Sequence, residues 1–378
     1  MTAADGGLPL GEPAVDENRE VVTMSSARWT LRDATTAEIA DWDALVLRNP
    51  DGGQWTQSSA YATLKRTERL HPRHLVLEGP ETVHALALEH RSLAGRFWYF
   101  ATGPGASFEQ LGGIAQAVRD ARAGAAKGVY AVKVEPFVVD TPEHREVLAA
   151  AGYRAANDIQ QNTHTVLVDL TPDVETIFAG FKKSLRNHIR YAERNGYRVE
   201  KVEPGEDTYR TMYGLMQTVS GGKGVEGMKP FEYYRTLWSA AVAQGSGHFW
   251  FGYDGAHDGP QASAFMIRFG RYALAKDGGS VPDRAIRGGA HLIRWRAMQW
   301  FKEQGAEIYD AYATPPSWAA DDTSHRLHGP GVFKRVFGPI VDHLPSHDLV
   351  LDQRRYRLFL RLLLPIERRV RRRPFGIW

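Results

Sequence analysis

Short apolar runs typical of strands alternate with helix-like runs along this chain, and the alternation occurs twice. In the first series, three apolar runs precede an alanine-rich, helix-like stretch and a fourth run follows it: 74–78, 83–90, 96–100, 110–126 and 129–135. The second series starts after Gly152. We predict an α/β (α+β) fold with a mixed sheet in each half of the chain, because helices that alternate with strands cover the faces of a sheet.

The second series begins with an apolar run at 164–170 and continues in a regular order. Helices are predicted near 173–195, 205–219, 230–243 and 284–304. Strands are predicted at the segments HFWFGY, ASAFMIRF, RYALAKD and AEIYDAY. No sustained heptad repeat is visible, so a long coiled-coil arm is not expected.

The composition is that of a globular protein, with 43% hydrophobic and 11% aromatic residues. A chain of 378 residues is long enough for two domains. It has no cysteine, which excludes disulfides, thiol nucleophiles and cysteine-bound metals and agrees with a reducing, cytoplasmic location. Residues 1–24 are expected to be a disordered leader, because they lack the basic start and apolar core of a signal peptide. No apolar run is long enough to span a membrane.

Neither a metal site nor a nucleotide-binding loop is evident. Three close pairs of histidines occur, but carboxylates are not spaced around them as ligands: His71/His74, His325/His328 and His343/His347. A GxSxG elbow, a Walker loop and a GxGxxG fingerprint are also absent. We therefore expect no metal, no cofactor and no use of ATP.

One lysine stands in an unusual setting. The stretch Gly329–Gly338, GPGVFKRVFG, places Lys334 between Phe333 and Phe337. Because an ammonium is rarely buried without a partner, its stem is expected to lie on the phenylalanines while its head meets a polar group. A surface lysine on a short amphipathic helix is the alternative.

A group of cations shares one predicted helix and its end. Residues 182, 186, 190 and 194 are four apart and so lie on one face, and the group comprises Lys182, Lys183, Arg186, Arg190, Arg194 and Arg198. Such a stripe is either a solvated face or a track for phosphates.

The segment RAIRGGAHLIRW (284–295) opens a helix with paired glycines. Backbone amides at a helix N-terminus can hold a phosphate, which would suit the pyrophosphate of acetyl-CoA. A plain helix start with tight packing is the alternative.

The order of these segments resembles the Fem-type aminoacyltransferase family (FemABX). The resemblance covers roughly residues 50 to 360 and rests on QWTQSSAYATLK, YFATGPGA, AVKVEPF, KKSLRNHIRYAERNG, GGAHLIRWRAMQWFKEQG, AEIYDAYATPP and FKRVFG. It implies two acyltransferase-like (GNAT-type) domains. We place them at 25–162 and 163–352, followed by a C-terminal helix and basic tail at 353–378.

The resemblance also implies residues for the donor and the acceptor. Lys183, Arg186 and Arg190 match the family's K-x-x-R-x-x-x-R pattern, and with Lys182 they are expected to bind tRNA. Lys65, at the end of the pattern Q-x-x-x-Y-x-x-x-K, is expected to bind the acceptor.

Four further positions are assigned in the same way. Lys229 with Tyr233 stands where the family has an arginine followed four residues later by tyrosine, and both are expected to bind the acceptor together with Phe333. Lysine keeps the charge but lacks the bidentate fork of arginine. Glu135 stands where the family commonly has an aspartate, and it either accepts a proton or orients the acceptor amine. Ordinary surface charge for Lys65 and Lys229, and a strand-end cap for Glu135, are the alternatives.

The activity that the resemblance implies is transfer of an amino acid from aminoacyl-tRNA to an amine of a peptidoglycan precursor peptide, with Lys334 and Glu135 as catalytic residues. One alternative is the same chemistry on a small peptide or amino-acid intermediate of antibiotic biosynthesis. The other is an acetyl-CoA-dependent GNAT acetyltransferase, or a non-catalytic binding protein, since fold does not fix function.

The C-terminal segment carries nine arginines against Glu367 alone, although the net charge of the chain is only +3. An apolar stripe at 3 and 4 spacing predicts that its first part is a helix packed on the body: Tyr356, Phe359, Leu360, Leu363 and Leu364. Pro365 is expected to bend or end that helix. The basic remainder is expected to hold tRNA phosphates or to lie on the inner face of an anionic membrane.

Overall fold

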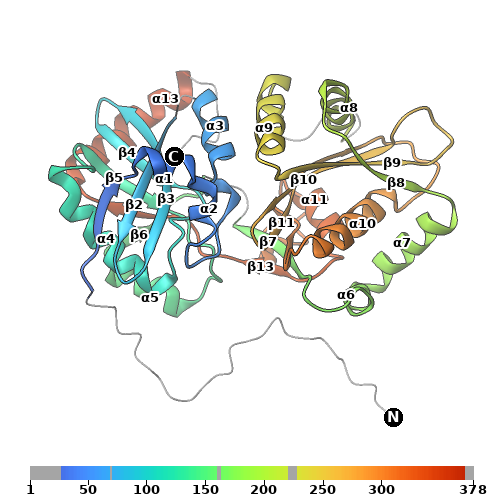
Figure 1. Ribbon diagram of the computed structural model, residues 1–378, viewed down its shortest axis with the longest axis horizontal. Helices are drawn as coiled ribbons and strands as arrows, with labels where there is room; N and C mark the ends of the chain where they lie inside the picture. The colour runs from blue at the N-terminus through green and yellow to red at the C-terminus, as the bar shows by residue number, and fades with distance from the viewer. Residues whose placement is uncertain (1–26, 69, 160–162, 220–227, 371–378) are drawn as a thin grey trace, which may run out of the picture. The chain divides into compact units, whose positions relative to one another are not determined.

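The computed structural model describes residues 27–68, 70–159, 163–219 and 228–370. The chain divides into two compact units (Figure 1). The first domain comprises the described residues of 24–163 and 342–378. The second domain comprises those of 164–238 and 245–341. Residues 239–244 group with the first domain. Residues 342–352, which we had expected in the second domain, thus belong to the first.

The first domain is built on a seven-stranded sheet in the order β1-β2-β3-β4-β5-β14-β6. Its strands are β1 Thr30–Asp33, β2 His71–Glu78, β3 Thr82–Ser92, β4 Gly95–Phe100, β5 Val129–Val134, β6 Tyr153–Ala155 and β14 His347–Val350. β4 and β5 run parallel, and the other neighbouring pairs are antiparallel. β14 lies between β5 and β6, which is why the end of the chain belongs to this domain.

Helices cover both faces of the first sheet. α4 (Leu111–Asp120) packs its apolar side on one face, where Leu77, Trp98 and Val132 lie in the same core. The other helices of this half are α1 Thr36–Ala40, α2 Trp42–Val46, α3 Ser59–Thr67 and α5 Pro142–Ala150.

The C-terminal helix closes the opposite face of this sheet. It consists of α12 (Gln353–Leu358), a π-helical segment (Phe359–Leu363) and α13 (Leu364–Val370). Phe359 is fully buried against Phe97 and Tyr130, and Leu364 is buried, as the apolar stripe predicted, but Leu360 of that stripe is exposed. Pro365 does not end the helix: it is the second residue of α13, and the wider turn immediately before it accommodates the missing backbone donor. Residues 371–378 of the basic tail lie outside the described residues.

The second domain has its own seven-stranded sheet, in the order β13-β7-β12-β11-β10-β9-β8. Its strands are β7 His164–Asp169, β8 Arg198–Val202, β9 Gly247–Tyr253, β10 Ala262–Phe269, β11 Tyr272–Ser280, β12 Ile308–Asp310 and β13 Ile340–Asp342. β11 and β12 are parallel, so the long helix that joins them must cross one face of the sheet.

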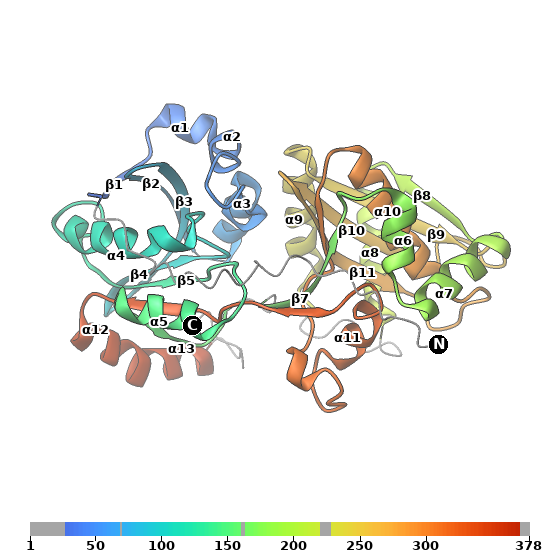
Figure 2. The same ribbon diagram turned by 90° about the horizontal axis from the view of Figure 1, so that it is seen from below.

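That helix is α10 (Gly289–Glu303), and it shares a core with α6 (Val174–Gly180) and α7 (Lys183–Arg194). The two views show α8 (Glu206–Gln217) and α9 (Phe231–Ala243) on the other face (Figures 1 and 2). There Trp238 packs on Phe249 and Phe265. α11 (His328–Lys334) is a short helix after β12.

The predicted fold class is confirmed, because each half is a layered unit with a mixed sheet. The longest helix in the described part of the chain, α10, has 15 residues. Among the helices that the structure describes, none is long and apolar enough to cross a bilayer. The region expected to be one helix at 173–195 is two, α6 and α7, separated by Phe181 in an extended conformation.

Candidate active site

A close contact between α11 and the loop after β12 brings Lys334 to its position. A Cβ atom at Gly331 would lie only 2.5 Å from the Cδ atom of Pro315, so a larger residue would push the helix away from the loop. About one turn further along α11, Lys334 reaches the backbone of that loop.

The ammonium of Lys334 meets two backbone carbonyls. Its Nζ atom donates to the carbonyl oxygens of Tyr312 at 2.6 Å and Ala313 at 2.8 Å. Tyr312 has a φ of 61°, a left-handed conformation that is uncommon for a bulky residue, and its N–H donates to Oδ1 of Asp310 at 2.7 Å. A strained backbone residue is therefore held between a buried acid and a half-buried lysine, as is common at functional sites.

Burial lowers the pKa of Lys334 to about 7, and the nearby charges of Arg294 and Lys276 contribute to the decrease while Asp310 opposes it. Burial also raises the pKa of Asp310, against the hydrogen bonds that it accepts from Thr165 and Tyr312. A lysine with this pKa exchanges its proton easily at neutral pH. The sequence predicted a lysine head on a polar group, and the structure places it on carbonyls.

The two phenylalanines beside Lys334 lie in different environments. Phe337 is buried in the core of the second domain. Phe333 stacks on His291 with ring centroids 4.4 Å apart, and His291 in turn stacks on His188. Burial lowers the pKa of His291 to about 4, so its ring is neutral at pH 7.

Buried polar atoms without partners lie in the same domain. The Nη1 atom of Arg294, on α10, and the Oγ1 atom of Thr314, in the loop after β12, have no hydrogen-bond partner among the described residues. Each such unmade bond costs about 1–3 kcal/mol unless water or a ligand supplies the partner. Arg294 and Asp310 were not foreseen from the sequence, because only the folded chain brings them near Lys334.

Two expected acceptor residues lie near this cluster, Tyr233 on α9 and Lys229 just before the start of that helix. The Nζ atom of Lys229 lies 5.9 Å from the ring centroid of Tyr233. Tyr233 is close enough to Lys276 for its charge to act on that lysine. The ammonium of Lys276 in turn lies 4.9 Å from the ring centroid of Tyr312. The structure thus links the expected acceptor helix to Lys334 through a lysine that sequence reasoning missed.

The other two expected residues belong to the first domain. Lys65 pairs with Glu68 at 2.5 Å and lies 5.0 Å from the ring centroid of Tyr61. Glu135 is 8% exposed. Its carboxylate accepts hydrogen bonds from the hydroxyl of Ser346 at 3.0 Å, the N–H of Thr102 at 3.3 Å and the hydroxyl of Tyr99. These bonds give Glu135 a structural task at the end of β5.

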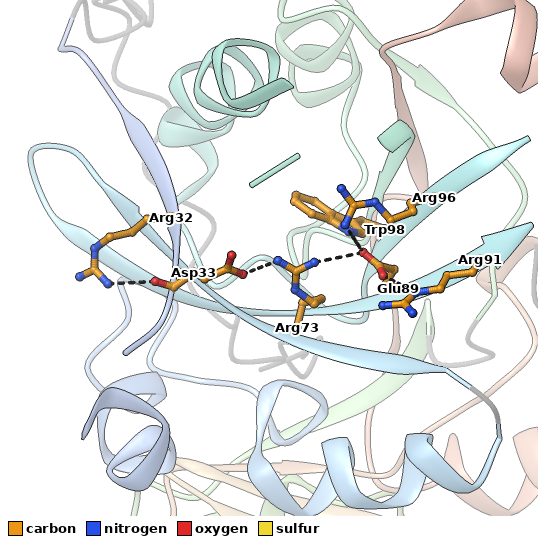
Figure 3. A network of polar contacts seen from close by, with 7 residues as sticks. All are labelled: Arg32, Asp33, Arg73, Glu89, Arg91, Arg96 and Trp98. Atoms are coloured by element: carbon orange, nitrogen blue, oxygen red, sulfur yellow. Dashed lines mark hydrogen bonds and ion pairs between the residues drawn. The ribbon is translucent and has the colours of Figure 1, made fainter. Parts of the chain in front are cut away.

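A second buried carboxylate of the first domain, Glu89, is fully occupied by its neighbours (Figure 3). It accepts hydrogen bonds from Trp98 at 2.9 Å and Arg91 at 2.8 Å, and it pairs with Arg73 and Arg96. Burial by itself raises the pKa of Glu89, but these donors hold it below the usual range. The network ties β2, β3 and β4 together, and we assign it to stability.

The basic residues on α7 divide into two kinds. The guanidinium of Arg186 donates to the carbonyl oxygens of Ala179, at 2.7 Å, and of Phe181, so it closes the end of α6. Lys182 and Lys183 are exposed, as is Arg190, whose guanidinium lies 5.2 Å from the ring centroid of Phe178.

The start of α7 is attached to the segment that carries Lys334. The backbone N–H of Lys182 donates to the carbonyl of Val336 at 3.2 Å, and Phe181 packs edge-on against Phe337. The exposed cations at the start of α7 therefore lie beside the Lys334 segment.

The paired glycines at the start of α10 are explained by packing. A Cβ atom at Gly289 would lie 2.2 Å from the ring of Tyr197, and one at Gly288 would lie 2.4 Å from the carbonyl oxygen of His188. Gly288 also has a φ of 86°. A glycine is thus required at both positions whether or not a phosphate binds there.

In the part of the chain that the structure describes, no three His, Cys, Asp or Glu side chains are grouped as a metal site.

Comparison with known proteins agrees with this architecture. The family model described as an acetyltransferase (GNAT) domain matches residues 179–318. No curated protein matches the chain. The crystal structure of FemX is similar over 87% of this chain and 99% of that one, with a TM-score of 0.73 and 16% identity. A conserved protein of unknown function from Bacteroides thetaiotaomicron is similar over 84% and 98%, with a TM-score of 0.51 and 12% identity. The resemblance to the Fem type is confirmed at the level of the fold.

Proposed function

We propose that this chain, which has the two-domain fold of FemX, is an aminoacyltransferase that moves an amino acid from aminoacyl-tRNA to an amine of a peptidoglycan precursor peptide. The observation that carries the proposal is Lys334, a half-buried lysine with two of its three donors fixed on carbonyls and a pKa lowered to about 7. The third donor has no partner among the described residues and is available to a substrate.

Aminolysis of an ester suits such a group. The acceptor nitrogen attacks the ester carbonyl, a C–N bond forms, the C–O bond to the tRNA ribose breaks, and the proton lost by the amine ends on the ribose oxygen. Negative charge develops on the carbonyl oxygen in between. A fixed Lys334 ammonium aimed at that oxygen stabilises the transition state without reorganisation. Because its pKa is close to neutral, Lys334 can also return a proton to the leaving oxygen.

We assign the remaining residues by their environments. Lys182 and Lys183, exposed at the start of α7 beside the Lys334 segment, and Arg190, exposed further along α7, would contact tRNA phosphates. Arg186 would act mainly by shaping that surface, because its guanidinium is bound to α6. We assign acceptor recognition to Lys229, Tyr233, Phe333 and Lys65. For Glu135 the hydrogen bonds to its carboxylate favour a positioning role over that of a base.

Two other activities compete with this proposal, one with a different acceptor and one with a different donor. An amino-acid or peptide intermediate of antibiotic biosynthesis would use the same Lys334 chemistry, so the acceptor alone separates the two. Transfer from acetyl-CoA is less favoured, since packing already accounts for Gly288 and Gly289. We propose a cytoplasmic location, and contact with an anionic membrane through the tail would be peripheral.

The proposal is tested by incubating the full chain with mixed radiolabelled aminoacyl-tRNAs and a cell-wall precursor. Transfer that RNase abolishes supports it, and transfer that occurs only with acetyl-CoA contradicts it. Lys334→Met should lower the transfer rate about 10²–10³-fold, the usual effect of losing one oxyanion donor.

A matched control exists in the same domain. Lys302 also donates its Nζ atom to two consecutive backbone carbonyls, those of Leu170 and Thr171. Lys302→Met removes an equivalent pair of hydrogen bonds and should leave transfer near the wild-type rate. Equal losses in the two variants would mean that Lys334 only supports the fold.

A further inference from the structure

Lys276 is the extra residue of a β-bulge. β10 and β11 pair regularly as far as Phe265 with Asp277, and then the register shifts so that Met266 faces Ala275. Lys276 has no partner across the sheet. A bulge changes the direction of a side chain and is frequent next to active sites.

The ammonium of Lys276 is largely enclosed and poorly satisfied. Its side chain is 18% exposed, and its Nζ atom lies 3.7 Å from Oδ1 of Asp277, which is longer than a hydrogen bond. Within the described residues it makes no hydrogen bond; its other neighbour is the ring of Tyr312. Asp277 itself accepts a hydrogen bond from Trp238 at 3.0 Å. Three ammonium donors therefore lack acceptors, an arrangement that favours a negatively charged ligand.

The position of Lys276 indicates which ligand would fit. Tyr233 and Tyr234, on α9, are close enough for their charges to act on Lys276, and Tyr312 carries the carbonyl that Lys334 binds. Lys276 thus stands between the helix assigned to the acceptor and the catalytic lysine. Its own charge also acts on Lys334, so an anion placed beside Lys276 would reduce the repulsion between the two lysines.

We propose that Lys276 binds a carboxylate of the acceptor peptide and fixes the acceptor amine next to Lys334. This inference rests on the proposed function and names the acceptor group that is recognised. A carboxylate fits better than a phosphate, because Asp277 beside the ammonium already offsets part of its charge and would repel a doubly charged group more strongly.

Binding can be measured without tRNA, by calorimetry of the full chain with two synthetic pentapeptides. Both have lysine as the third residue; one has free carboxylates and in the other every carboxylate is an amide. The wild type should bind the acidic peptide about tenfold more tightly or better, as expected for a charge-assisted hydrogen bond. Lys276→Met and Lys276→Gln should bind both peptides alike, with the affinity that the wild type has for the amide.

Lys201 provides the matched control, because its ammonium also lies over an aromatic ring, 4.7 Å from the centroid of Trp300, on an exposed strand position of the same domain. Lys201→Met should keep the preference for the acidic peptide. Retained affinity for the amide in the Lys276 variants shows that they are folded. If the Lys276 variants still prefer the acidic peptide, or if the wild type does not prefer it, the inference about Lys276 is wrong, while the proposed function stands. If neither peptide binds the wild type, the acceptor class of the proposed function is refuted as well.

Discussion

The burial of Lys334 makes a quantitative prediction about stability. A lysine has an ordinary pKa of 10.5, and in the folded chain that of Lys334 is lowered to about 7. Between these two values the unfolded chain binds more protons than the folded one, so folding stability rises with pH. The free-energy penalty of keeping Lys334 charged in the folded state is fully present below pH 7 and is absent above pH 10.5, where the lysine is neutral in both states.

The magnitude follows from the two pKa values. At 1.36 kcal/mol per pKa unit, the complete effect is on the order of 5 kcal/mol. Over the accessible window from pH 7 to pH 9, the wild type should gain about 2 kcal/mol relative to Lys334→Met, which has no titrating group at this position. The variant also loses the hydrogen bonds to Tyr312 and Ala313. That loss shifts the difference in unfolding free energy by the same amount at every pH and does not change how the difference depends on pH.

The assay is urea unfolding of both proteins at four pH values from 6.5 to 9, compared as differences so that titrations elsewhere cancel. Lys302→Met is carried through the same series, and any pH dependence that it shows is subtracted as the effect of losing a lysine bound to two carbonyls. Competitive labelling of Lys334 against pH, read by mass spectrometry, gives an independent midpoint. A wild-type-minus-variant difference that stays flat, with a labelling midpoint near 10.5, would refute the desolvated ammonium.

Three further outcomes are expected. Gly331→Ala should reduce transfer at least tenfold without loss of secondary structure by circular dichroism, since its new Cβ atom meets the facing proline, whereas Gly329→Ala, with open space around it, should be active. Neutralising Lys183 and Arg190 together should make the logarithmic salt dependence of tRNA affinity shallower by roughly 1.4–1.8, at 0.7–0.9 per phosphate contact; an unchanged slope would mean a solvated face. Lys65→Ala should raise the KM for the acceptor far more than the KM for aminoacyl-tRNA, and equal KM values to the wild type would make Lys65 a structural partner of its helix.

The sequence predicts the long, strongly patterned elements and misses most of the short ones, although it does predict the three-residue β12 within AEIYDAY. β3 and β10 are rich in apolar residues, and the burial of those residues follows from their hydrophobicity. β1, β6 and β14 have three or four residues each, too few for a period to be recognised. Their place is fixed by pairing partners distant in the chain, which no local pattern encodes.

The candidate site shows the same division. Lys334 could be identified from the sequence, because a lysine flanked by two phenylalanines is unusual. Lys276 lies in a strand-like run where it reads as one more alternating polar residue, and only the register shift against Met266 shows that it is the extra residue. Arg294 is one of several basic residues on α10, and its significance comes from an unpartnered nitrogen that only the packing reveals.

Three elements converge on Tyr312, and this convergence explains how a single lysine could dominate the chemistry. Asp310 binds the N–H of Tyr312, Lys334 binds its carbonyl, and Lys276 lies over its ring. With two donors of Lys334 committed to the backbone, the third has one direction left, so the orientation of the ammonium is set before any substrate arrives. An arginine at position 334 would carry the charge on a planar fork that cannot match two successive carbonyls in the same way. The Lys334→Arg variant should therefore remain as impaired as Lys334→Met, and recovery of transfer by arginine would mean that charge alone, without this fixed geometry, is what the reaction requires.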